Sequence, residues 1–271
     1  DPLWSRGLGD VYKRQEWLIP PHYEGDSLYM LSLFESVSRG EFLPYSSIIV
    51  STLGAPFTAS WNDFPVSGPL MLLFGGFLAN WFGLGLAANT LLVFAHIVST
   101  TAMFFSLRAM GVSRGWSSVF SICFGLAPFL FHRGMTHLVL TFAYPVPITC
   151  ALCFLIYKSG STFLSGWRLV FVAVLAFYFG GIFPYYTAFF LMLMCLCALY
   201  CILNERKLSA LSPFVLIALC TFANFYLVTQ PLRSYADIHG KNELAVSRFY
   251  ANVQTAALRP VEMFLPGSDS K

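Results

Sequence analysis

The sequence predicts an all-α protein, a polytopic bundle of transmembrane helices. Hydrophobic residues make up 57% of the 271 residues and charged residues only 11%, less than half of the roughly 25% found in average soluble domains. Between residues 66 and 229, the few charged residues separate apolar stretches that approach the ~20 residues a helix needs to cross a bilayer. These observations exclude an ordinary water-soluble globule and indicate a multi-pass membrane protein.

Six spanning helices are expected, and basic residues occupy every second short loop between them. The expected spans are residues 84–107, 116–131, 138–157, 168–183, 185–203 and 211–229. The basic loops carry Arg108, Arg114, Lys158, Arg168, Arg206 and Lys207. Residues 84–229 are therefore expected to form the bundle. Because short loops rich in Lys and Arg stay in the cytoplasm, residues 16–83 and 230–271 are expected on the outer side of the membrane. The segment 230–271 is expected to lead to a missing C-terminal part.

The first 15 residues differ in character from the rest of the chain. SRGLGDVYKRQ, residues 5–15, is polar and basic, and it resembles an in-frame translation of a transposase adapter used in sequencing libraries. A charged leader before a membrane segment is the alternative, but no long apolar run follows it directly. We therefore expect residues 1–15 to be non-native and the chain to be a fragment truncated at both ends.

Two juxtamembrane helices are expected in the first outer loop. After Asp26, apolar residues recur at the spacing of an amphipathic surface helix: Leu28, Leu31, Phe34 and Val37. The stretch 66–80 is apolar but short and contains Gly and Pro, so we expect it to lie in the interface. Counting it as a full span would reverse the orientation of the basic loops.

Charge and cysteine usage exclude two other classes of function. The formal net charge of +3, without a Lys/Arg cluster, is too small to indicate nucleic-acid binding. All seven cysteines fall in apolar stretches, which favours packing over disulfide formation. Cys150 and Cys153 form a C-x-x-C pattern, but they lack the second ligand pair of a zinc site.

Acidic residues of the first outer loop are the candidate catalytic groups. Asp26 is expected at the start of the surface helix, where it could cap the backbone N–H groups, accept a hydroxyl proton or coordinate a divalent cation. Glu24 and His22 could share that role. Asp63 follows Asn62 in a Pro- and Gly-rich loop. The pair could form an Asx turn, or Asp63 could provide a second catalytic carboxylate near Asp26.

Candidate phosphate ligands lie in a second outward connection, FHRGMTH. Arg133 could form bidentate hydrogen bonds with a phosphate, although snorkelling to ordinary lipid phosphates is the alternative. His132 and His137 have a spacing compatible with zinc, but no further ligand follows, so hydrogen bonding is favoured. Arg233, after the last expected span, is a further candidate. Pro145, Pro147 and Pro184 are expected to interrupt helices and to shape a pocket.

The layout resembles the GT-C superfamily of bacterial membrane glycosyltransferases, including its YfhO-like group. The resemblance rests on EGDSLY, LGAPF, NDFP, GPLMLLFG, HRGMTHLVL and LRPVEMFLP in this order. It implies the transfer of a sugar from a polyprenyl-phosphate donor to a cell-envelope glycan, lipid or polymer, outside the bacterial cytoplasmic membrane. It also implies that an acidic residue of the first outer loop, here Asp26, is catalytic. Because the first helix and the C-terminal part of this layout are expected to be missing, we expect activity of the complete protein rather than of the fragment.

A lipid or polysaccharide transporter or flippase is the alternative function. Transporters place polar or ionisable residues near the middle of their spans. His96 and Asn224 are the candidates in this chain. Either residue could equally serve in packing between helices.

Overall fold

The computed structural model confirms the all-α fold and describes residues 19–20, 26–46, 49–51, 59–60 and 68–240. The α-helices are α2 (Asp26–Ser38), α3 (Pro69–Phe82), α4 (Leu84–Ala109), α5 (Arg114–Gly125), α6 (Pro128–Arg133), α7 (Leu138–Thr141), α8 (Pro145–Ser159), α9 (Gly166–Gly180), α10 (Pro184–Glu205) and α11 (Ser212–His239). Short 3-10 helices cover Gly160–Phe163 and Leu208–Leu211, and the strands β1 (Ile49–Val50) and β2 (Ala59–Ser60) pair antiparallel. Residues 1–15 and the tail from residue 241 lie outside the described residues.

Within the residues that the structure describes, five helical segments are long and apolar enough to cross a membrane, so the chain is a multi-pass membrane protein. They are Leu84–Ala109, Arg114–Arg133, Leu138–Phe163, Pro184–Glu205 and Leu208–His239. The remaining expected span, 168–183, corresponds to the helix α9, whose 15 residues extend roughly 22 Å. This length is less than the ~30 Å of a bilayer's hydrocarbon core, and α9 packs lengthwise against α11.

Three of the expected spans differ in the structure, two by a helix break and one by a longer helix. Pro128 begins α6 after a break that follows α5, and Pro145 begins α8 after the break that separates it from α7. Both prolines stand in the first turn of a helix, where their missing N–H is tolerated. The third difference is the end of α11, which lies at His239 rather than at residue 229 because the helix continues through Pro231.

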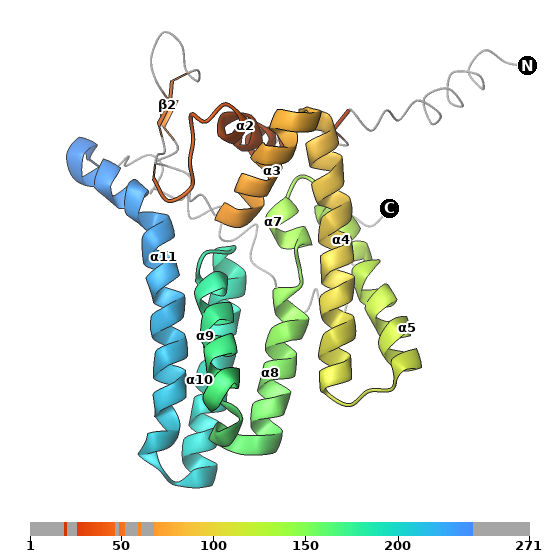
Figure 1. Cartoon of the computed structure of the whole chain (residues 1–271), viewed down its shortest axis with the longest axis vertical. Coiled ribbons are helices and arrows are strands. Elements are labelled where there is room, and N and C mark those ends of the chain that lie inside the picture. Colours follow the sequence, from red (N-terminus) through yellow and green to blue (C-terminus); the bar gives the residue numbers. More distant parts are fainter. Residues whose placement is uncertain (1–18, 21–25, 47–48, 52–58, 61–67, 241–271) are drawn as a thin grey trace, which may run out of the picture.

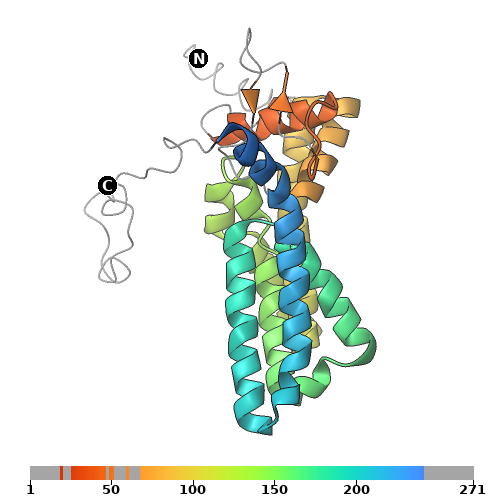
Figure 2. The ribbon, with the colours of Figure 1, turned by 90° about the vertical axis from the view of Figure 1, so that its left-hand side faces the viewer.

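The chain runs up and down so that its basic loops gather at one end. The connections α4–α5, α8–α9 and α10–α11 lie at the bottom of Figure 1, whereas α2, α3 and α7 lie towards the top. Figure 2 shows α2 and α3 across that upper end of the bundle. This arrangement agrees with the expected alternation, and the positive-inside rule then predicts that α2 and α3 face outward.

The helices α2 and α3 approach closely at two glycines of α3. A Cβ atom on Gly75 would overlap with the Phe34 ring, and one on Gly76 would overlap with the Val37 side chain. Phe34 is fully buried in a core that α2 shares with α3 and α4. Of the apolar positions of α2, Leu31, Phe34 and Val37 therefore pack against protein, whereas Leu28 is exposed.

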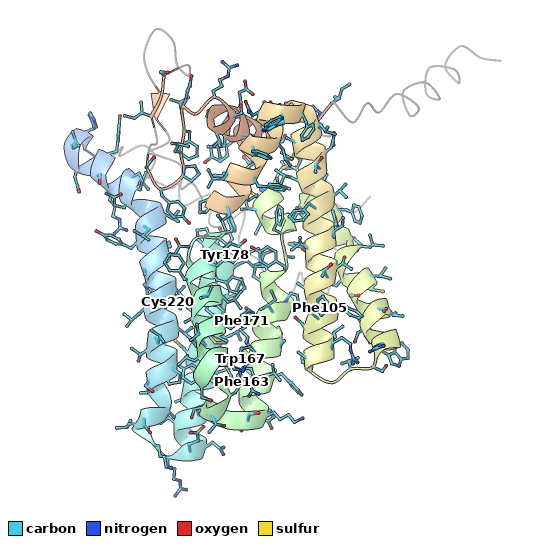
Figure 3. All side chains as sticks on the ribbon, viewed as in Figure 1. Phe105, Phe163, Trp167, Phe171, Tyr178 and Cys220 are labelled. Carbon is cyan, nitrogen blue, oxygen red and sulfur yellow. The ribbon has the colours of Figure 1, made fainter. Side chains whose placement is uncertain are left out.

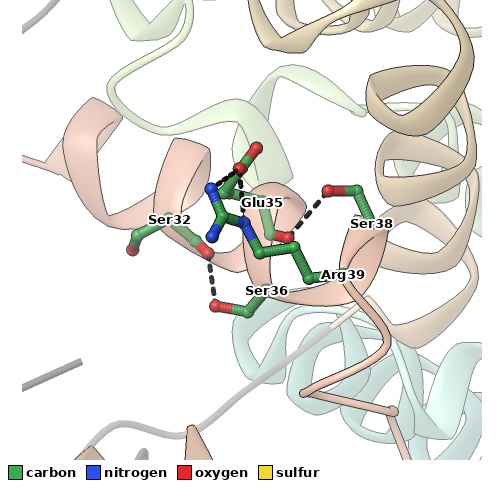
Figure 4. A network of polar contacts seen from close by, with 5 residues as sticks. All are labelled: Ser32, Glu35, Ser36, Ser38 and Arg39. Carbon is green, nitrogen blue, oxygen red and sulfur yellow. Dashed lines mark hydrogen bonds and ion pairs between the residues drawn. The ribbon is translucent and has the colours of Figure 1, made fainter. Parts of the chain in front are cut away.

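Polar side chains in the second half of α2 and just after it form hydrogen bonds within this segment, as Figure 4 shows. The Arg39 Nε donates to Glu35 Oε1 over 2.7 Å, and the Ser38 Oγ donates to the Glu35 carbonyl over 2.7 Å. The Ser36 Oγ donates to the Ser32 carbonyl at the same distance. These contacts hold the last turns of α2, so the functional groups left to face the bundle are those at its start.

A second core joins α8, α9, α10 and α11. The rings of Phe179 and Phe190 meet edge to face, with centroids 5.2 Å apart, in the favourable geometry for aromatic pairs. Cys153 contacts the Cys197 thiol of α10, whereas Cys150 is exposed. No described cysteine forms a disulfide.

Replacing Gly75 with valine tests the close approach of α2 to α3. Gly75→Val should destabilise the protein by about 1–3 kcal/mol, because the added side chain overpacks a filled contact. Gly115→Val is the matched control, since a Cβ on Gly115 meets nothing within 4 Å. Thermal unfolding of the two purified variants in the same detergent measures the difference, and equal midpoints would contradict the packing.

Candidate functional site

A cavity of about 910 Å³ lies where α2 begins, beside the turn between α6 and α7 and the first turn of α10. Its wall contains Asp26, Arg133 and His137, three of the residues that the sequence singled out. They come from segments about 110 positions apart in the chain. The fold therefore brings the predicted acid and two of the predicted phosphate ligands into one place.

Asp26 and His137 form a direct pair. The distance between Asp26 Oδ2 and His137 Nδ1 is 3.4 Å, and the side chains are 65% and 40% exposed. The contact is an ion pair when the imidazole is protonated. Asp26 is the first residue of α2, where the helix dipole favours a negative charge. The sequence placed it one position earlier, as the N-cap, which lies within the usual uncertainty of a helix boundary.

Arg133 brings a positive charge to the same cavity. It is the last residue of α6, and its guanidinium carbon lies 5.2 Å from the centre of the Phe129 ring. Its Nε is buried and has no hydrogen-bond partner among the described residues. A guanidinium offers a fork of donors that matches a phosphate group, so Arg133 keeps hydrogen-bonding capacity for an anionic ligand.

The turn between α6 and α7 explains how Arg133 and His137 reach one cavity. Gly134 ends α6 with a φ of 44°, a conformation that a side chain would strain. The His137 N–H donates to the Arg133 carbonyl over 3.0 Å, and the Thr141 Oγ1 donates to the Gly134 carbonyl over 3.0 Å. Met135 is fully buried beneath the turn. These contacts fix the turn and hold both side chains beside α2.

Hydroxyl groups complete the polar wall, and the sequence analysis did not single them out. They belong to Tyr29, Ser32, Thr136 and Tyr185. Burial, followed by the negative charge of Asp26, raises the pKa of Tyr29 to about 12, so this phenol remains protonated at neutral pH. Tyr29 stands three positions after Asp26, a spacing that places both on one helix face and could have revealed it.

The structure does not bring every candidate to the cavity. His132 is exposed and is not among the described wall residues. Arg233 belongs to α11, where its guanidinium carbon lies 4.1 Å from the Tyr226 ring centre and its Nη2 donates to Thr229 Oγ1 over 2.6 Å. Phosphate binding by Arg233 is therefore not supported by its position. His22, Glu24 and Asp63 lie outside the described residues.

The described residues do not assemble a metal site. Among them, no group of three His, Cys, Asp or Glu side chains converges on one point. Asp26 is the only carboxylate on the described wall of the cavity, whereas Mg²⁺ and Ca²⁺ take about six or more oxygen ligands. The described part of the chain therefore does not by itself provide the expected divalent-cation site.

The two residues that motivated the transport alternative have different environments. His96 Nδ1 lies 2.7 Å from the Gly125 carbonyl, and the imidazole thereby ties α4 to the end of α5. Asn224 instead lines a separate cavity between the helices. Within the described chain, the alternative therefore depends on Asn224 rather than on His96.

Comparisons with known proteins add no family. No protein-family model, no curated protein and no solved structure matches this chain. The resemblance to GT-C glycosyltransferases thus rests on the sequence motifs, and the case for a function rests on the cavity that contains Asp26, Arg133 and His137.

Proposed function

We propose that the complete protein is a membrane-embedded glycosyltransferase. It transfers a sugar from a polyprenyl-phosphate donor to a cell-envelope glycan, lipid or polymer, outside the bacterial cytoplasmic membrane. The observation that carries the proposal is the meeting of Asp26, His137 and Arg133 in one cavity. The resemblance to the GT-C superfamily supplies the donor class.

The three side chains match the chemical needs of glycosyl transfer. The reaction requires that a hydroxyl nucleophile lose its proton and that a phosphate leave with its negative charge stabilised. The Asp26 carboxylate can accept the proton, and the adjacent His137 orients that carboxylate. The Arg133 guanidinium can bind the departing phosphate. The sequence predicted His137 as a phosphate ligand. Because its side chain contacts Asp26, its main role in this proposal is to orient the carboxylate.

The position of the cavity suits a donor held in a lipid bilayer. Arg133 follows two apolar side chains of α6 that are more than half exposed, Phe129 and Phe131. Such side chains are compatible with lipid, and an arginine at the end of the same helix lies within reach of lipid phosphates. The hydroxyls of Tyr29, Ser32 and Tyr185 offer hydrogen bonds of the kind that a sugar forms.

The role of Asp26 is tested by removing its charge. In the complete gene product, Asp26→Asn should lower sugar transfer on the order of a hundredfold, the contribution typical of a general base. Asparagine has nearly the size of aspartate, and a charge at the start of α2 contributes only about 1 kcal/mol or less through the helix dipole, so folding and membrane insertion should persist. Transfer from a polyprenyl-phosphate sugar is measured in membranes that contain equal amounts of folded protein.

The control for Asp26→Asn is Asp237→Asn. It makes the same chemical change at an exposed position of α11, a residue outside the described cavity wall. Transfer by this variant should match the wild type. Near-normal transfer by the Asp26 variant would refute the catalytic assignment and leave Asp26 with a role in helix stability alone.

The role of Arg133 is tested by phosphate binding. Arg133→Gln should weaken the binding of a short polyprenyl phosphate about tenfold or more, because charge-assisted hydrogen bonds are lost. Arg233→Gln should leave the affinity unchanged, since Arg233 is engaged within α11. Titration of both purified variants with the lipid in detergent compares them. Equal losses, or no loss for Arg133→Gln, would contradict the assignment.

A further inference from the structure

A second cavity, of about 480 Å³, lies beside the first and shares Val139 and Phe183 with it. Its size is within the range of small-molecule sites. Its described wall contains no Asp, Glu, Lys, Arg or His. A charged ligand would lose its hydration there without gaining a partner, so the described wall favours a neutral ligand.

Asn224 lines this cavity and has an unused hydrogen-bond acceptor. The residue is only 2% exposed, and its Nδ2 donates to the Phe177 carbonyl over 2.8 Å. This hydrogen bond fixes the orientation of the amide. The Oδ1 atom is buried and has no hydrogen-bond partner among the described residues. Leaving such an acceptor unsatisfied is unfavourable, and a ligand that donates a hydrogen bond would relieve the penalty.

Two tyrosines of the same wall leave an unused donor. The hydroxyl oxygens of Tyr144 and Tyr178 are 2.5 Å apart. One hydroxyl donates to the other, so the hydrogen of the second has no acceptor in the described part of the chain. Tyr45 lies on the same wall, and its hydroxyl is close to the Asn224 side chain. The hydroxyl group of a ligand can both donate and accept a hydrogen bond. It therefore matches the unused acceptor of Asn224 and the unused donor of the tyrosine pair.

An apolar groove of about 730 Å³ continues from this cavity and shares Val98 and Tyr144 with it. The groove runs between α4 and α9 beside α8. Its wall contains four aromatic residues labelled in Figure 3, Phe105, Phe163, Trp167 and Phe171, together with Arg168, whose guanidinium carbon lies 5.4 Å from the Phe163 ring centre. Tyr178 lies nearer the end that carries α3, and the other four lie further along the bundle. A hydrocarbon chain could therefore follow the groove while its polar end stays near Asn224.

We propose that the cavity and the groove together bind a neutral lipid alcohol from the bilayer. Its hydroxyl donates to Asn224 Oδ1 and accepts from the tyrosine pair, and its hydrocarbon chain lies in the groove. This site is distinct from the cavity that contains Asp26, and the inference does not depend on the proposed glycosyl transfer.

The test compares two photoreactive probes in membranes that contain the full chain. One probe is a diazirine-bearing hexadecanol, and the other is the matching hexadecane without a hydroxyl. The alcohol should label residues of the cavity and groove wall, and excess unlabelled hexadecanol should suppress this labelling. Asn224→Leu should reduce labelling by the alcohol about three- to tenfold, the range expected from one lost hydrogen bond, and should leave labelling by the hydrocarbon unchanged.

Two further variants keep the test decisive. Thr221→Val is the control, because the Thr221 hydroxyl bonds the Ile217 carbonyl of its own helix and is not on the described wall. Its labelling should match the wild type. If Asn224→Leu does not fold, Tyr178→Phe removes one hydroxyl of the pair and should weaken labelling by the alcohol selectively. Equal labelling by both probes, or labelling that neither variant changes, would overturn the proposal.

Discussion

The close approach of α2 to α3 is the contact on which the candidate site depends. α2 carries Asp26, but it is a short helix at the end of the bundle and contributes no membrane span. Gly75 and Gly76 let Phe34 and Val37 reach the backbone of α3, and this packing holds α2 across the bundle. Asp26 then lies 3.4 Å from His137, which belongs to the turn between α6 and α7.

The breaks in the helices are constrained by a second requirement, that every buried backbone group find a hydrogen-bond partner. In lipid, an uninterrupted helix satisfies its own hydrogen bonds, whereas a break must be covered by protein. The break before Pro145 leaves Phe142 and Tyr144 facing the smaller cavity, and the connection before Pro184 contributes Phe183 to both cavities. The segments before these prolines thus contribute side chains to the two cavities.

The sequence was sufficient for the architecture because lipid imposes strong constraints on composition. Apolar length and the alternation of basic loops predicted the spans, and the spacing of Leu31 and Phe34 predicted α2. The same signals could not place the end of α11, since Pro231 is tolerated inside the helix, and they counted α9 as a span although it has only 15 residues. Helix breaks of this kind depend on neighbouring segments, which composition does not describe.

The candidate site was predicted in part. Asp26, Arg133 and His137 were recognised from their residue types and their outward position, and the structure brings them together. Arg233 was chosen on the same grounds, but its partners Tyr226 and Thr229 lie on its own helix, a contact that charge alone does not reveal. Asn224 was considered only for transport, because the sequence does not show which polar groups lack a partner.

The most direct measurement is the proximity of Asp26 and His137 in the membrane-embedded protein. In a cysteine-free background, Asp26→Cys combined with His137→Cys should react efficiently with a short bifunctional thiol reagent. Arg39→Cys combined with His137→Cys should not, since Arg39 follows α2 about 20 Å from Asp26 along the helix. Mass spectrometry of the digested protein identifies the linked peptides. Equal reaction of both pairs, or failure of the first pair in folded protein, would contradict the account.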